Sequence, residues 1–153
     1  MQSIENSDLQ DLSKHLNDLL EEMPNERRNL HEKLADLAKE EVDRQIASTV
    51  NDSSGKIQSW QEPHVGSGGG YAAVRATDSG TGSNSPGAIT NYLENGHKIR
   101  TPSGNLSHYR TNIHTPYVEG RHFYEASRSA LESQSISLAE DFADKLAERL
   151  ENG

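Results

Sequence analysis

Leucines recur at intervals of three and four residues near the start of the chain. One apolar stripe is formed by Leu9, Leu12, Leu16, Leu19 and Leu20. A second stripe continues from Leu30 to Val50. This spacing predicts amphipathic helices. Because a proline ends one helix and suits the first turn of the next, Pro24 divides the region into two predicted helices, Ser7–Met23 and Asn25–Asn51.

The middle third of the chain alternates strand-like segments with glycine-rich stretches. Lys56–Glu62, with Ile57 and Trp60 as its bulky members, is a predicted strand, and Tyr71–Thr77 is a second short one. The segments 66–70 and 78–87 are rich in glycine and serine, which predicts flexible loops. Ala88–Glu94 fits a third strand or a short helix, and its periodicity does not decide between them.

A long polar loop, Asn95–Pro116, precedes a C-terminal helix that begins near Glu119 or Arg121 and ends at Glu151. The sequence therefore predicts an α+β fold in a single domain over residues 1–153. Two N-terminal helices occupy about 7–51, and a small antiparallel sheet with long loops occupies about 55–117. A long C-terminal helix, about 120–151, is expected to pack on the sheet.

The composition is lean for a chain that must bury its own core. Hydrophobic residues make up 31% of the 153 residues, and the mean hydropathy is -0.87. Such a chain is stable when partner subunits complete its burial, which favours an assembly component, although partial disorder gives the same composition. The net charge of -9 argues against stable binding of nucleic acid. An acidic channel through which DNA slides remains compatible with it.

Several classes of protein are disfavoured by what the sequence lacks. There is no cysteine, hence no disulfide and no thiolate site. No apolar run is long enough to cross a bilayer, and the N-terminus lacks the pattern of a signal peptide. We therefore expect no membrane partner and assembly in the cytoplasm.

The candidate catalytic and metal-binding patterns are weak. Four of the seven histidines, His97, His108, His114 and His122, lie in or beside the long loop, but their spacing matches no zinc motif. The glycine run 66–70 is not followed by the lysine and helix of a phosphate loop, and no Gly-x-Ser-x-Gly elbow occurs. The sequence predicts no metal, no cofactor and no enzymatic activity. A metal-dependent hydrolase that uses the loop histidines is the alternative from another class.

Three segments, taken in order, carry a resemblance to a known family. They are Asp52–Trp60 after the long helix, Ile89–His97 in the middle, and Thr115–Ala126 before the last helix. In this order they resemble the tailed-phage family labelled "Hong Kong ninety-seven gene product ten-like", whose members are putative tail components. The resemblance covers most of the chain from about Leu30 to Leu146.

The resemblance implies a structural virion protein of the neck of a long-tailed virus. Such a protein would form a homo-oligomeric ring, hexameric or a multiple of it, between the head-closure complex and the tail terminator or tail tube. Genomic DNA would pass through the ring only as passive cargo. A tail terminator or tail-completion protein of the same virion is the alternative within this class.

The motifs also suggest which residues meet a neighbouring subunit or partner. Trp60 is a large anchor, Gly96 permits a tight reversal after Tyr92 and Glu94, and Phe123 plugs the final helix into the body. Glu94 is expected to bind backbone amides of the loop or a basic residue of a neighbouring subunit. The candidates for that basic residue are Arg100, Arg110 and Arg121.

Overall fold

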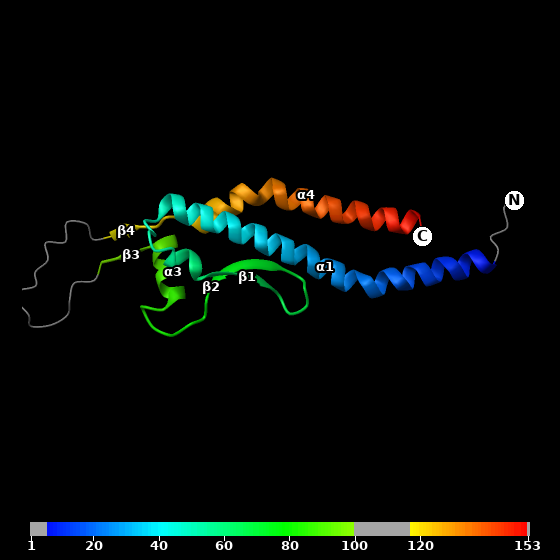
Figure 1. The fold of residues 1–153 in the computed structure, drawn as a ribbon, viewed down its shortest axis with the longest axis horizontal. Helices are drawn as coiled ribbons and strands as arrows, with labels where there is room; N and C mark the ends of the chain where they lie inside the picture. Colours follow the sequence, from blue (N-terminus) through cyan, green and yellow to red (C-terminus); the bar gives the residue numbers. More distant parts are fainter. Residues whose placement is uncertain (1–5, 100–116, 153) are drawn as a thin grey trace, which may run out of the picture. The chain divides into compact units, whose positions relative to one another are not determined.

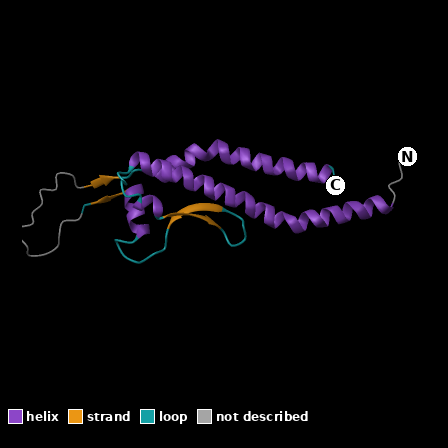
Figure 2. Cartoon of the chain, in the orientation of Figure 1, coloured by secondary structure: helices purple, strands orange, loops and turns teal. Residues whose placement is uncertain are grey.

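The computed structural model describes residues 6–99 and 117–152. The chain is α+β, as predicted, with two long helices and short strands (Figures 1 and 2). It divides into two compact units. The first unit comprises Met1–Lys39, Pro63–Val74 and Ala130–Gly153, and the second comprises Glu40–Glu62 and Arg75–Ser129.

One continuous helix, α1 (Asn6–Thr49), replaces the two helices predicted on either side of Pro24. The prediction of a break was wrong, although proline lacks the amide that would bond to the carbonyl four residues earlier. The guanidinium of Arg149 bonds to the carboxylates of Glu22 and Glu26, one on each side of Pro24. These contacts hold both sides of the proline in register with the C-terminal helix.

The prediction of a strand over Lys56–Glu62 is partly wrong, because this segment begins as a helical turn, α2 (Lys56–Ser59). The cause is Asp52, whose carboxylate accepts bonds from the amides of Lys56 at 2.9 Å, Ile57 at 2.7 Å and Gln58 at 3.1 Å. A side chain that satisfies the first free amides in this way stabilises a helix start.

Among the residues that the structure describes, two separate two-stranded sheets replace the single predicted sheet. The first pairs β1 (Gln61–Val65) with β2 (Ala72–Ala76), and the second pairs β3 (Gly96–Lys98) with β4 (Tyr117–Glu119). In the second sheet the strands are antiparallel and His97 lies opposite Val118. The glycine-rich segment 66–70 turns the chain between β1 and β2, as its composition predicts.

The ambiguous segment after the second glycine-rich loop is a helix, α3 (Pro86–Asn95). Ser85 caps it by accepting a bond from the amide of Ala88 at 3.3 Å, and Pro86 occupies the first turn, where its missing amide costs nothing. The C-terminal helix is α4 (Phe123–Glu151) and agrees with the predicted one to within a few residues.

In the first unit, α1 and α4 lie side by side and run antiparallel (Figure 1). The tip of the β1–β2 hairpin is held by two neighbouring arginines of α1. Arg27 donates to the carbonyl of Gly68 at 2.9 Å, and Arg28 donates to that of Ser67 at 3.0 Å. The tight basic pair in the sequence is thus used to anchor this loop.

The second unit holds most of the fully buried side chains among the described residues. Val42 and Ile46 of α1 and Phe123 of α4 form its apolar part. Five polar side chains are also buried in it: Glu41, Gln61, Thr90, Glu94 and Ser127. Because buried polar groups are costly without partners, their hydrogen bonds decide how this core is organised.

None of the described helices combines the length and the apolar character that a bilayer-spanning helix needs.

Candidate functional site

Glu94, near the end of α3, is 9% exposed and lies against the start of α4. Its carboxylate accepts bonds from the backbone amides of Tyr124 at 3.0 Å and Glu125 at 3.3 Å. These amides belong to the first turn of α4, where no carbonyl of the same helix can serve them. A carboxylate there also has a favourable interaction with the helix dipole.

The backbone reinforces this contact between α3 and the segment before α4. The amide of Arg121 donates to the carbonyl of Leu93 at 2.7 Å, and the amide of His122 donates to the carbonyl of Glu94 at 3.2 Å. A Cβ at Gly120 would overlap the Glu94 carbonyl oxygen. Gly120 is therefore required by close backbone approach.

Gly96 is required for two reasons. Its φ is 79°, in the region that residues with a Cβ rarely adopt. A side chain there would also overlap the carbonyl oxygen of Val118. The predicted tight reversal after Tyr92 and Glu94 is thus present, and the reversal feeds directly into β3.

Gln61, at the start of β1, joins α4 to α2 and α3. The Tyr124 hydroxyl donates to Gln61 Oε1. Gln61 Nε2 donates to the carbonyl of Ile57 at 3.1 Å and to Thr90 Oγ1 at 3.2 Å. With 1% of its surface exposed, Gln61 is a buried amide whose oxygen and nitrogen both have partners.

Burial, and to a smaller extent the charge of Glu94, raise the pKa of Tyr124 to about 12. The phenol is therefore neutral at physiological pH and serves as a hydrogen-bond donor. We call Gln61, Thr90, Glu94, Phe123 and Tyr124 the Glu94 junction. Its hydrogen bonds connect α2, α3, β1 and α4, so its polar groups have a structural role.

Phe123 is completely buried, as expected for a residue that fixes the final helix. Its ring centroid is 4.8 Å from that of Tyr124, and its carbonyl accepts a bond from Ser127 Oγ at 2.6 Å. The buried position of Phe123 agrees with the prediction that this residue packs the start of the final helix against the rest of the fold.

Trp60 and Tyr92 are less enclosed. Trp60 is half-buried, with the Lys56 amine 5.2 Å from its ring centroid, an arrangement that favours a cation–π interaction. Tyr92 is 38% exposed, and its ring lies 5.3 Å from that of His97. Both residues are more exposed than Glu94 and Phe123.

Glu94 meets backbone amides, as one of its two expected modes requires, but these amides belong to α4 and not to a loop. Arg121 is exposed and contributes its backbone amide. Arg100 and Arg110 lie outside the described residues. Whether Glu94 also binds a basic residue of another subunit stays a prediction.

The histidine hypothesis concerns residues that the structure covers only in part. His97 and His122 are exposed, and His122 Nδ1 lies 3.6 Å from the Glu125 carboxylate. His108 and His114 lie outside the described residues. Over 6–99 and 117–152 no three histidine, aspartate or glutamate side chains gather as a metal site would need.

Sequence reasoning missed Asp52, Gln61, Thr90 and Tyr124. Asp52 had a usable signal, because an aspartate a few residues before a helical turn is a favoured cap. Gln61 and Thr90 had none, since their roles depend on partners 63 and 29 residues away in the sequence.

No family model, no curated protein and no solved structure matches this chain. The family resemblance of the three segments therefore stays a prediction.

Proposed function

We propose that this chain is a structural virion protein of the head-to-tail neck of a long-tailed virus. It forms a ring around the DNA channel and joins the head-closure complex to the tail. The observation that carries the proposal is the Glu94 junction. It unites residues from or directly beside all three segments on which the resemblance rests, namely Gln61, Glu94 and Tyr124.

The chemistry of the junction supports a structural role for these motifs. Glu94 and Gln61 use their polar atoms to connect elements, and Phe123 is inaccessible. A motif that served catalysis would hold a reactive group next to a cavity. Here the matching positions hold the fold together, which is what a family of assembly proteins would share.

The surface supports assembly. Large apolar side chains of the first unit are exposed, namely Leu16, Leu20, Tyr71, Ile136 and Leu150. Leu16 and Leu20 lie four residues apart on one face of α1, and an exposed apolar pair of this kind suits a subunit whose surface is covered by neighbours. The net charge of -9 suits a channel that DNA crosses without being held.

Native mass spectrometry of the purified full chain tests the proposal. We expect a closed oligomer of six copies, or a multiple of six, of the 16.9 kDa chain. Negative-stain images of the same sample should show rings with a central opening. A monomer at every concentration, or an open-ended series of masses, would contradict the proposal.

A second experiment tests for the protein in separately purified heads and tails, which shows where in the virion it lies. A neck protein is expected on heads that have not yet joined a tail. Recovery of the protein on free tails alone would instead identify a tail terminator.

A further inference from the structure

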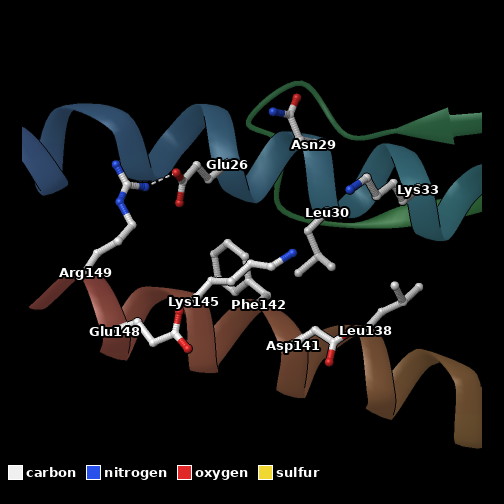
Figure 3. A pocket seen from close by; sticks show the side chains of 10 residues that line it. All are labelled: Glu26, Asn29, Leu30, Lys33, Leu138, Asp141, Phe142, Lys145, Glu148 and Arg149. Atoms are coloured by element: carbon white, nitrogen blue, oxygen red, sulfur yellow. Dashed lines mark hydrogen bonds and ion pairs between the residues drawn. The ribbon is translucent and has the colours of Figure 1, made fainter. Parts of the chain in front are cut away.

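A groove runs between α1 and α4 within the first unit (Figure 3). Its volume of about 560 Å³ lies in the range of binding pockets. Leu30 of α1 and Leu138 and Phe142 of α4 line its apolar part, and all three are half-buried. The two helices thus leave apolar surface uncovered where they lie beside each other.

Two lysines border this apolar surface. Lys33 projects from α1 and Lys145 from α4, and in this view the side chain of Lys145 overlaps that of Phe142 (Figure 3). Asp141 and Glu148 line the same groove, but their carboxylates lie along α4. Neither lysine has an ion pair or hydrogen bond with the part of the chain that the structure describes. The groove therefore offers an apolar floor and two amines ready for a carboxylate.

The opposite features occur on the N-terminal part of α1, which belongs to the same unit. Leu16 and Leu20 are 42% and 63% exposed, and a spacing of four places them on one face of the helix. Glu21, next to Leu20, is exposed. Over residues 10–22 four acidic residues stand against one lysine, so the segment is acidic.

We propose that residues 10–22 of α1 dock into the α1–α4 groove of a second copy of this chain. Leu16 and Leu20 would cover Leu30, Leu138 and Phe142, and Glu21 would pair with Lys33 or Lys145. The inference rests on the proposed ring and identifies the contact that builds it.

The occupant is a second copy for a geometric reason. The segment and the Leu30 wall lie on the same continuous helix, about 20 Å apart along its axis at 1.5 Å per residue. Leu16 and Leu20 therefore cannot reach the apolar floor of their own groove, although Glu22 of the same segment bonds to Arg149 at its edge. Because the docking segment and the groove are different surfaces, each copy gives one contact and receives another, which is the kind of contact that a ring requires.

Cross-linking between single-cysteine variants tests the contact, since the natural chain has no cysteine. Leu20→Cys is mixed with Asn29→Cys, an exposed residue at the groove, and treated with a short bismaleimide. Any product between the two variants must join different copies. The control mixture replaces Asn29→Cys by Ser129→Cys, which is exposed on α4 outside the groove. We expect several-fold more cross-linked dimer with Asn29→Cys than with the control.

A charge exchange provides the second test. Lys145→Glu should shift the native mass toward smaller species, and adding Glu21→Lys should restore the oligomer. Helical circular dichroism of each variant shows that it has folded.

The outcomes separate this contact from the ring itself. An oligomer that gives equal cross-linking in both mixtures, and no recovery in the exchanged pair, would refute the docking and leave the proposed function standing. A chain that is monomeric at every concentration would refute both.

Discussion

Glu94 occupies a position where one side chain serves two helices. It lies near the end of α3 and accepts the first free amides of α4. A helix start that is buried without such an acceptor would leave unbonded amides in the core. The carboxylate of Glu94 thus stabilises the start of a helix of the same chain.

Replacement of Glu94 by Gln should lower the free energy of unfolding by about 1–2 kcal/mol, because the amide offers only one oxygen to two amides and carries no charge. Urea unfolding followed by circular dichroism measures the loss. Glu119→Gln, at an exposed position of β4, is the control and should change little. Equal losses in both variants would show that Glu94 is not a cap.

Gly120 gives a steric test of the same contact. Gly120→Ala should destabilise the protein by roughly 1–3 kcal/mol, since the added Cβ would overlap the Glu94 carbonyl oxygen. The matched control is Gly68→Ala, because a Cβ at Gly68 meets no atom within 4 Å. A Gly120→Ala protein as stable as the Gly68→Ala protein would mean that α3 and the start of α4 are not in contact.

The raised pKa of Tyr124 predicts that the stability of the protein decreases at alkaline pH. Its pKa is about 12 in the folded chain, against an ordinary value of 10.0. An unfolded tyrosine therefore loses its proton first, so the contribution of Tyr124 is complete below pH 10 and is lost as the pH rises toward 12. The measurable quantity is the difference in urea midpoint between the natural chain and Tyr124→Phe. A difference that stays constant across this range would contradict the buried, neutral phenol.

α1 and α4 are the two longest helices among the described residues. α1 passes through Pro24 without ending, and Arg149 of α4 bonds to Glu22 and Glu26 on either side of the proline. Hydrogen bonds from Arg149 to these two glutamates raise the pKa of its guanidinium, which stays charged. One side chain of α4 thus bonds to residues on both sides of the proline at which the sequence predicted a break.

Arg149→Ala should loosen α1 before Pro24. Hydrogen exchange of the amides in residues 10–22 is expected to become several-fold faster, because the proline has already removed one bond of the helix there. High salt should reduce the difference from the natural chain, since exposed ion pairs are screened. Arg128→Ala, also exposed on α4, is the control and should leave exchange in residues 10–22 unchanged.

The balance between core and surface concerns the whole molecule. Only five apolar side chains are fully buried within the described residues, whereas nine large ones are exposed. A chain with this distribution gains stability when copies cover one another. In the proposed ring, contacts between copies would supply this additional stability.

The melting temperature of the natural chain should therefore rise with protein concentration. Circular dichroism over a wide range of concentrations measures it, and Lys145→Glu should melt at a lower temperature with a weaker dependence. A melting temperature independent of concentration would be the result expected of a monomer that is stable by itself.

The hydrophobic periodicity of the chain was sufficient to predict the regions of the two long helices and the α+β class, but not the short helices α2 and α3. Apolar residues at spacings of three and four mark α1 and α4, and the glycine run 66–70 marks the turn between β1 and β2. These features are local, because each depends on neighbours along the sequence. The same holds for Gly96, because a glycine directly after Tyr92–Asn95 predicted the tight reversal of the chain at that point.

Tertiary structure decided what depends on distant partners. Pro24 lies inside α1, with Arg149 bonded to glutamates on both sides of it, and Glu94 accepts bonds from α4 although 30 residues separate it from Tyr124. Gln61 and Thr90 carry no signal of their own, since an amide or hydroxyl becomes structural only when burial removes water as its partner. Spacing along the chain determined the elements, and burial and hydrogen bonding between remote residues determined how they are joined.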